Sequence, residues 1–493
     1  VQPAREARDG GVARVKGAAT RAASAGPPPP AAPAGPAIRR RRAPAELTFA
    51  LDEAFVESRA SQEPDWLAAD RRAAFARWQA LPVEVNQLYT TYVDLRTADL
   101  SAVLPWESPA AGPAPTVAAT LPEGVAGLAS FVEDRVEALV LDDASRAAGV
   151  VLVSLARLIE RDEPLARRLV GDESSLPIDD KLAQLTRAGW NQGVVLLVPA
   201  GVRLERPIVL RWQAGQAGRA LLTRTILDLG EGAAASVVEE IEPSLGASGL
   251  DGPQALFTGT LEVHLAAGAE LAIASIQDLA TGTVAFQHRR AEIGEGASLH
   301  WALAQLGGRL VRSRVDNRLA GNRSSVEQVE IVFGADDQLF DLTSHTRHIG
   351  RDTTGNLLSK GALMDASRSY MKGLIIIEPT AVGTDSFLGE FGMNLSKKAR
   401  AVAIPSLEID QPDCRRAAHS SSVGPIDESQ LFYLESRGIP PDEARKFIVL
   451  GFLEPVVARV PLASTQERLR ELLEAKWDAG PLAGAAGSPG AAA

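Results

Sequence analysis

The stretch GVVLLVPAGVRLERPIVLRW, residues 193–212, opens the part of the chain that decides the fold. It reads as an apolar strand, a Pro-Ala-Gly turn and a second strand, because short apolar runs bounded by turn residues are typical of buried strands. Strand-like segments without intervening helices then follow: Arg219–Leu229, Ala234–Glu240, Leu256–Leu265, Glu270–Gln277, Arg289–Ile293, Leu299–Ala304, Leu310–Leu319 and Ser325–Val332. The same texture continues through Gln338–His348, Gly355–Gly361, Ser367–Ile377 and Asp385–Ile404.

Similar turns separate several of these strands. Gly230-Glu231-Gly232-Ala233, Ala266-Ala267-Gly268-Ala269 and Gly294-Glu295-Gly296-Ala297 recur at spacings of 36 and 28 residues. Self-similar strand-turn units favour a β-solenoid over a sandwich, because a sandwich rarely extends beyond about 100 to 200 residues per domain. We therefore predict a mainly β protein with a parallel β-helix core over residues 191–423. The handedness and the number of coils stay open.

Upstream of this core the pattern is helical. Residues 47–81 carry large apolar side chains mostly at helical intervals, interrupted at Glu63-Pro64, which predicts two helices. Residues 99–123 are rich in Pro, Ala and Gly and read as a loop, whereas residues 124–190 combine short strands with helical pieces. Residues 46–190 are therefore predicted to form an N-terminal domain of helical and α/β character.

Downstream of the core, residues 424–478 are predicted to form a C-terminal helical domain. Asp427 can cap a first helix, which Gly438 and Pro440-Pro441 end. A second helix, Asp442 to Leu453, has acidic residues in its first turn, and a charged amphipathic helix follows over Val456–Trp477. The second helix is expected to bury Ala444, Phe447, Ile448 and Phe452.

The two ends of the chain lack the large apolar side chains that a core needs. Residues 1–45 are mostly Ala, Pro, Arg and Gly, and residues 479–493 are Gly, Ala and Pro with few others, so we expect a disordered leader and a disordered tail. An organellar transit peptide would also be rich in Arg. The leader contains Glu6 and Asp9, however, and shows no convincing amphipathic helix.

Composition narrows the functional classes. A net charge of −11 with only 4 Tyr and 7 Trp argues against nucleic-acid binding. The single cysteine, Cys414, excludes a disulfide framework and a self-contained Cys-rich metal or cluster site, because such a site needs about three or four thiolate or imidazole ligands. No apolar run approaches the roughly 18 residues of a membrane span, and the leader lacks a secretory signal, so we expect a cytoplasmic protein without membrane contact.

Few residues offer chemistry by themselves. The sequence has no GxxxxGK[ST], GxSxG, HExxH or CxxC motif, so ATP-dependent work would need a partner. His345 and His348 are three apart on a predicted strand, so they should face opposite sides and not share an ion. Cys414 stands beside Arg415 and Arg416, cations that favour a thiolate, although an incidental cysteine is the simpler interpretation. His419 lies at the exit of the predicted solenoid.

The end of the core carries a resemblance to a known family. The stretch DSFLGEFGMNLSKKARAVAIPSLEI (385–409), followed by HSSSVGPIDESQLFYLESRGIPPDEARKFIVLGFLEPVV (419–457), closely resembles the C-terminal signature of the SufB/SufD family of iron–sulfur cluster assembly proteins. Residues 341–373 and 198–201 resemble further family positions, and EPDWLAADRRAAFARWQALP (63–82) resembles its opening helices. The similarity covers roughly residues 46–477.

Within that family, the resemblance implies a SufD-like subunit. SufB-like chains carry a cysteine in the strand corresponding to about Glu390–Leu395 and a glutamate where this chain has His419. The cysteine usual in SufD, two residues before the histidine, is Ala417 here, so the resemblance carries no thiol role over to Cys414. It implies a non-enzymatic scaffold that pairs with a SufB-like subunit and docks the SufC ATPase while nascent iron–sulfur clusters are assembled. Whether a flavin binds stays open.

Two other functions stay open as well. One is a SufB-like subunit that itself holds the cluster, against which the single cysteine counts. The other is a β-helix carbohydrate-active enzyme; such enzymes use paired carboxylates and are generally secreted, whereas this chain shows no signal peptide and ends in helices.

The SufD-like interpretation predicts two sites. His419 is expected to supply an imidazole to iron or to a nascent cluster shared with the partner, with Arg415 and Arg416 nearby to favour anionic sulfur. A second site, the docking surface for the ATPase, is expected on the helical pair Asp427–Phe452. The alternative is that the aromatic side chains of this pair only close the end of the solenoid. The residues predicted for docking are Phe432, Tyr433, Phe447 and Phe452.

Overall fold

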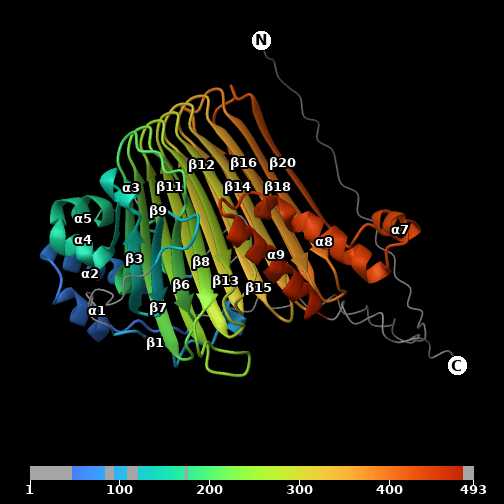
Figure 1. Ribbon diagram of the computed structural model, residues 1–493, viewed down its shortest axis with the longest axis horizontal. Coiled ribbons are helices and arrows are strands. Elements are labelled where there is room, and N and C mark those ends of the chain that lie inside the picture. The colour runs from blue at the N-terminus through green and yellow to red at the C-terminus, as the bar shows by residue number, and fades with distance from the viewer. Residues whose placement is uncertain (1–46, 84–93, 108–119, 172–175, 481–493) are drawn as a thin grey trace, which may run out of the picture. The chain divides into compact units, whose positions relative to one another are not determined.

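Successive strands of the chain alternate between two sheets, so that the chain winds as a coil (Figure 1). The first sheet has the order β19-β17-β15-β13-β11-β9-β7-β5-β4, with β1 paired to β7, and the second has the order β20-β18-β16-β14-β12-β10-β8-β6-β2-β3. Strands that lie one turn of the coil apart pair in parallel, without a shift in register. The structure, a computed structural model, confirms the predicted parallel β-solenoid with flanking helices. It describes residues 47–83, 94–107, 120–171 and 176–480, so the predicted leader and almost all of the predicted tail lie outside the described residues.

The strands match the predicted segments closely. Those of the coil are β5 (Gln192–Val198), β6 (Ile208–Ala214), β7 (Arg219–Leu229), β8 (Ala234–Pro243), β9 (Ala255–Leu265), β10 (Glu270–Gln277), β11 (Thr283–Ile293), β12 (Ser298–Gln305), β13 (Leu310–Leu319), β14 (Ser325–Gly334), β15 (Leu339–His348), β16 (Thr354–Leu363), β17 (Arg368–Ile377), β18 (Asp385–Asn394), β19 (Arg400–Ile409) and β20 (Arg416–Gly424). The single strand expected over Asp385–Ile404 is wrong. A turn closed by the N–H of Ala399 on the carbonyl of Ser396 separates β18 from β19.

The repeated glycine turns form one corner of the coil. Gly232, Gly268 and Gly296 have φ of 66°, 66° and 62°, a left-handed conformation that glycine adopts without steric cost. Each donates its N–H to a carbonyl in the next coil, as Gly232 does to Ala267 at 2.9 Å. In later coils, non-glycine residues such as Arg323 take the same corner at positive φ, which is why the sequence repeat fades.

Helices and short strands of the N-terminal segment cover the first sheet and the start of the coil. The elements are α1 (Glu53–Ala60), α2 (Asp65–Ala80), η1 (Leu95–Thr97), β1 (Leu104–Pro105), β2 (Gly127–Val132), β3 (Arg135–Leu141), α3 (Asp143–Ala147), β4 (Val151–Ser154), α4 (Leu155–Arg161), α5 (Glu163–Val170) and α6 (Lys181–Gly189). The two helices predicted before residue 81 are confirmed as α1 and α2. Their apolar side chains pack with those of α6 on outward-facing residues of the first sheet, such as Leu222, Leu256 and Phe286. The short strands β2, β3 and β4 extend the two solenoid sheets, β3 and β4 through antiparallel pairing.

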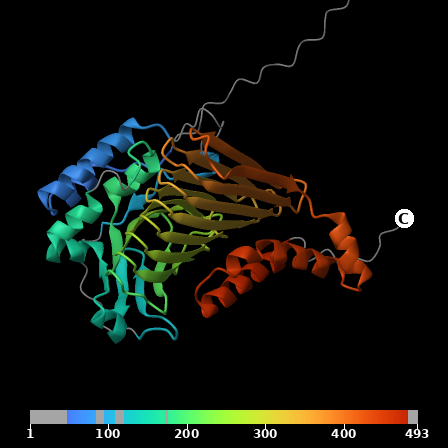
Figure 2. The same cartoon turned by 90° about the horizontal axis from the view of Figure 1, so that it is seen from above.

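Three helices follow the last strand: α7 (Glu428–Ser436), α8 (Pro441–Val457) and α9 (Ala463–Asp478). The buried side chains of α8 and α9 pack on the outer face of the second sheet, where Val449, Leu453 and Trp477 join one apolar cluster. By contrast, α7 buries none of its side chains and lies beyond the last strands (Figure 2). Among the described helices, none is long and apolar enough to cross a membrane.

Candidate functional site at the open end of the solenoid

The last coil leaves two strand edges unpaired in this chain. β19 pairs only with β17, and β20 only with β18. Most side chains of β20 are exposed. The large apolar residues exposed at the ends of the two strands are Ile409 of β19 and Val423 of β20. An unpaired edge of this length offers free backbone N–H and C=O groups and is a template for pairing with another chain.

His419 lies on the exposed strand β20. Its register partner on β18 is Leu388, which is fully buried in the interior. Because partners in a parallel pair point to the same face of the sheet, His419 lies on the inward-facing side of the last coil, and it is exposed because no further coil covers it. Within the described ranges, no three His, Cys, Asp or Glu side chains converge to hold a metal ion. A metal held by His419 would therefore need ligands from another molecule.

The neighbouring charged residues do not face His419. Arg415 pairs with Asp352 at 2.5 Å, and Arg416 pairs with Asp385 at 2.6 Å. Arg416 is three residues before His419, and the alternation of side chains along a strand places it on the opposite face. Cys414 is half-buried against apolar residues of the last coils. Arg415 and Arg416 therefore form ion pairs within the solenoid.

Glu390 is an inward-facing residue of β18 that sequence reasoning missed. Its Oε2 accepts a hydrogen bond from the backbone N–H of Ile404 in the opposite sheet, at 2.8 Å. A Cβ added to Gly373 would lie 2.8 Å from Oε1, so the glycine is what lets the carboxyl group approach the facing strand. Burial raises the pKa of Glu390 to about 8. The available signal was an acidic residue at an inward position of an alternating strand.

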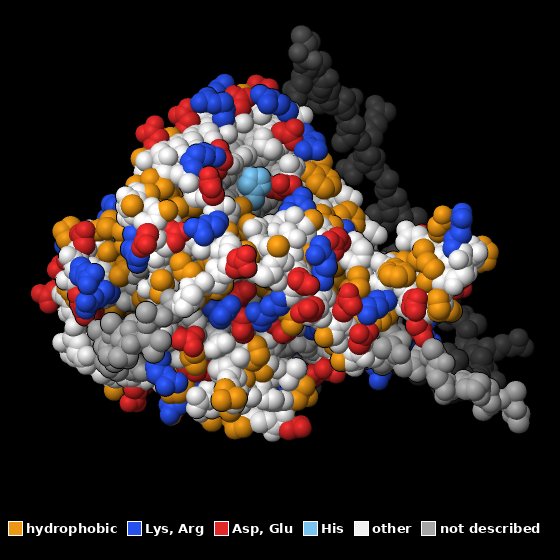
Figure 3. All heavy atoms as spheres, in the orientation of Figure 1, with side chains coloured by type: hydrophobic (Ala, Val, Ile, Leu, Met, Phe, Trp, Pro, Cys, Tyr) orange, Lys and Arg blue, Asp and Glu red, His pale blue; other side chains and the backbone are white. Residues whose placement is uncertain are grey.

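The predicted ATPase-docking residues fall into two groups. Phe432 is 72% exposed, and Tyr433 and Phe447 are each more than half exposed. Figure 3 shows hydrophobic side chains gathered over α7 and the adjoining part of α8. We name the exposed set Phe432, Tyr433 and Phe447 the aromatic patch. Phe452 differs, because it is half-buried and its ring lies 4.6 Å from the Nζ of Lys360.

The prediction that Phe447 is buried is wrong. The buried positions of α8 are Ala444, Val449, Leu453, Val456 and Val457. The helix turns these towards the second sheet, whereas Phe447 lies on another face.

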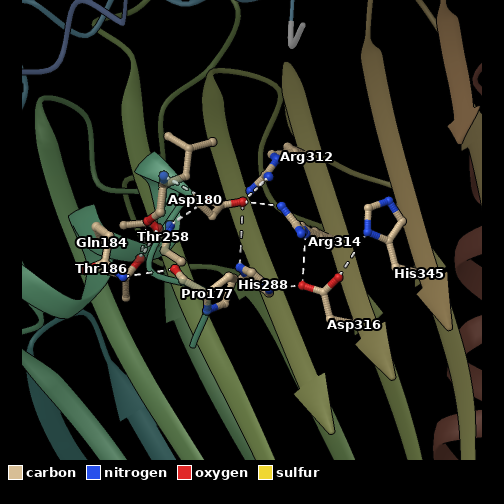
Figure 4. A network of polar contacts seen from close by, with 12 residues as sticks. Pro177, Asp180, Gln184, Thr186, Thr258, His288, Arg312, Arg314, Asp316 and His345 are labelled. Atoms are coloured by element: carbon tan, nitrogen blue, oxygen red, sulfur yellow. Dashed lines mark hydrogen bonds and ion pairs between the residues drawn. The ribbon is translucent and has the colours of Figure 1, made fainter. Parts of the chain in front are cut away.

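A second polar cluster joins α6 to the first sheet (Figure 4). Asp180 caps α6 by accepting hydrogen bonds from the N–H groups of Leu182 and Ala183. It also forms ion pairs with Arg312 and, at 2.8 Å, with Arg314.

Asp316 is the second carboxylate of this cluster. It accepts hydrogen bonds from His288 at 2.7 Å and from Arg314 at 2.9 Å, and it lies 3.4 Å from His345. Burial would raise the pKa of Asp316, but Arg314 and the two histidines hold it well below its usual range. This cluster clamps α6 onto the solenoid.

His348 faces away from this cluster. Its ring nitrogens contact Thr353 at 2.8 Å and Ser386 at 3.1 Å in the interior, and burial lowers its pKa to about 4. The prediction that His345 and His348 face opposite sides of a strand is confirmed.

Comparison with known proteins places these features in a family. A family model described as the SufBD core domain of the SUF system for FeS cluster assembly matches residues 211–452. The chain is 27% identical over 329 residues to the iron-sulfur cluster assembly protein SufD of Bacillus subtilis, covering 66% of this chain and 74% of that protein. It is 34% identical over 213 residues to an iron-sulfur cluster assembly SufBD family protein of Mycobacterium tuberculosis, covering 42% of this chain and about half, 54%, of the relative. A SufBD family protein of Staphylococcus epidermidis is 24% identical over 347 residues, which is 70% of this chain and 73% of the relative.

Fold and site together define a β-solenoid protein with one open end and a helical extension beyond it. The core of the chain, residues 211–452, belongs to the SufB/SufD family of iron–sulfur cluster assembly proteins. The resemblance read from residues 385–409 and 419–457 is thereby confirmed.

Proposed function

We propose that the chain is a SufD-like scaffold subunit that pairs with a SufB-like subunit, docks a SufC-type ATPase and has no enzymatic activity of its own. The observation that carries this proposal is the open last coil, in which His419 lies on an exposed strand whose outer edge is unpaired in this chain. The relative that matches over 74% of its length bears the name SufD, which supports this subunit over a SufB-like one. The single cysteine supports it too, because a chain that held a cluster alone would need more soft ligands.

The partner would continue the sheets of the solenoid. Strand addition to a free edge gives affinity through backbone hydrogen bonds and specificity through alternate side chains. The edges of β19 and β20 offer the backbone groups, and Ile409 and Val423 offer apolar contacts at their ends. A SufB-like subunit with the same fold would present a matching open coil.

His419 would then face the partner and supply one imidazole to a nascent iron–sulfur cluster. Imidazole nitrogen is a good ligand for iron, and thiolates of the partner would complete the set. The cluster is the cargo of this site and leaves it, which is consistent with a site that one chain only half provides.

The aromatic patch would dock the ATPase. Exposed aromatic side chains on a protruding helix concentrate binding energy when they enter a groove. The sequence has no nucleotide-binding motif of the form GxxxxGK[ST], so ATP hydrolysis belongs to the partner. Because that partner consumes ATP, the complex would work in the cytoplasm.

The test is co-expression of the tagged chain with its SufB-like and SufC-type partners, followed by iron and sulfide analysis of the purified complex. We expect a three-component complex that carries both elements. His419→Ala should leave the complex intact and lower its iron and sulfide content on the order of tenfold, the effect of losing about 1.4 kcal/mol of binding. Ser420→Ala, a neighbour on the opposite face of β20, is the matched control and should retain both. Full cluster content in His419→Ala, or a complex that no longer forms, would contradict the ligand role.

A further inference from the structure

Glu390 connects the two strands that form the open end of the solenoid. Its backbone lies on β18, where Glu390 is the register partner of Ser421 in β20. Its carboxyl group reaches across the interior, and Oε2 accepts a hydrogen bond from the backbone N–H of Ile404 in β19 at 2.8 Å. Gly373 of β17 faces this carboxyl group, and a Cβ added there would lie 2.8 Å from Oε1. One side chain therefore ties the sheet that ends in β20 to the sheet that ends in β19.

Apolar packing contributes little at this level of the last coil. Side chains alternate along a strand, so β19 turns Ala401, Ala403 and Pro405 towards the interior, and β20 turns His419 and Ser421. Small side chains bury little apolar area, and burial stabilises in proportion to that area. Away from the turn between β18 and β19, no second side-chain hydrogen bond within the described residues joins β19 to the other sheet. The carboxyl contact is therefore a main part of what holds the centre of β19 in place.

Pro405 leaves the open edge of β19 without a backbone donor at its centre. At the two ends of β19, the N–H groups of Arg400 and Asp410 donate to carbonyls on the β17 side, at 3.0 and 2.9 Å. Backbone N–H groups alternate in direction along a strand, so those of the odd-numbered residues face the open edge. Residue 405 is one of these, and proline has no N–H. Pairing at this edge therefore depends on the remaining N–H and C=O groups, which must be held at the spacing of a partner strand.

We propose that Glu390 is a positioning residue of the open end, which sets the spacing between the free edges of β19 and β20 by holding Ile404. This inference rests on the proposed function, in which a SufB-like subunit pairs with these edges. A partner that adds strands to both edges then meets them already ordered, so association does not include the entropy cost of ordering β19. Because His419 lies on β20, the same contact fixes the imidazole relative to the edge of β19.

The first measurement uses the full chain alone. Hydrogen exchange of the Ile404 amide, resolved by mass spectrometry with backbone fragmentation, reports the contact directly. Glu390→Met keeps the length of the side chain and removes the acceptor. We expect the Ile404 amide of this variant to exchange on the order of tenfold faster, which corresponds to about 1.4 kcal/mol. Glu390→Gln keeps an acceptor and should exchange at the wild-type rate.

The second measurement is the dissociation constant of the complex with the SufB-like subunit. We expect Glu390→Met to weaken binding on the order of tenfold and Glu390→Gln to bind as the wild type does, because only glutamine keeps the contact with Ile404. Glu330→Met is the matched control. It replaces a buried inward acid of the same sheet, on β14, away from the open end. Glu330→Met should change neither the exchange of the Ile404 amide nor the affinity for the partner, even where it lowers the melting temperature.

Unchanged exchange or unchanged affinity in Glu390→Met would overturn the positioning role, as would equal losses in Glu390→Gln or in Glu330→Met. Should Glu390→Met not fold, Glu390→Asp asks the same question, because its side chain is one methylene shorter and does not reach Ile404. Faster exchange and weaker binding in Glu390→Asp support the proposal, and wild-type values contradict it. A wild-type chain that does not bind the SufB-like subunit would contradict the proposed function itself. Equal binding by the wild type and Glu390→Met contradicts the positioning role alone, so the two failures are distinguishable.

Discussion

The carboxyl group of Glu390 spans the interior of the solenoid and accepts a hydrogen bond from the backbone N–H of Ile404 at 2.8 Å, which ties β18 to β19 of the opposite sheet. Its folded-state pKa is raised from 4.5 to about 8 by burial, so between these values the folded chain binds a proton that the unfolded chain has released. The free energy of unfolding therefore falls as pH rises through this window. The effect on stability is a few kcal/mol at most, because each unit of pKa is about 1.4 kcal/mol.

Glu390→Gln should remove that dependence. Glutamine keeps an acceptor for the Ile404 N–H and cannot ionise, so we expect the variant to gain stability relative to the wild type as pH rises from 5.5 to 9, and to differ least at pH 5.5. Urea denaturation across this range measures the difference. Two curves that stay parallel at every pH would show that Glu390 does not carry a shifted proton.

Asp180 should be indispensable for the attachment of α6. It is fully buried, caps the helix and faces Arg312 and Arg314, so Asp180→Asn keeps an N-cap but leaves buried positive charge less compensated. Breaking a buried ion pair on one side costs about 3 to 5 kcal/mol. We expect a loss of this size in urea denaturation. Asp142→Asn, which changes the cap of α3 and an ion pair with the exposed Arg206, is the control and should lose about 1 kcal/mol or less.

The aromatic patch offers a test in which binding and stability separate. Phe432→Ala and Tyr433→Ala change exposed residues of a helix that buries none of its side chains, so the melting temperature should stay the same. Each should weaken co-purification of the SufC-type ATPase by about 2 kcal/mol, or roughly thirtyfold, as central aromatic residues do in interfaces. Phe452→Ala is the contrasting variant, because it removes the ring that packs on Lys360 and should lower stability. Normal ATPase recovery with both α7 variants would leave the patch without a docking role.

The structural features that the sequence predicted correctly are those set by local residue patterns. The features that were missed depend on how strands and helices pack in the tertiary structure. Alternating apolar residues and glycine turns mark strands and corners locally, so the coil was predictable and β7, β10 and β13 matched to the residue. The position of His419 at the end of the coil followed from chain order alone. Glu390 was missed although it is an acidic residue on an alternating strand, because its place in the interior is set only once β18 is paired with β16 and β20.

Phe447 was misplaced for a related reason. An amphipathic pattern shows which residues share a face of a helix, but not which face a neighbour covers. The covered face of α8 carries Val449 and Leu453, because that is the side on which the second sheet lies.

The two ends of the solenoid should respond differently to charge. Val423 on β20 and Val151 on β4 are equally exposed, at 40% and 38%, and each lies on the last strand of a sheet. Lysine on an edge strand opposes pairing, because its ammonium group would have to be desolvated in the interface. We therefore expect Val423→Lys to abolish co-purification with the SufB-like subunit and Val151→Lys to leave it unchanged, with little effect of either on the melting temperature. Loss of the partner in Val151→Lys with retention in Val423→Lys would move the interface to the other end of the coil.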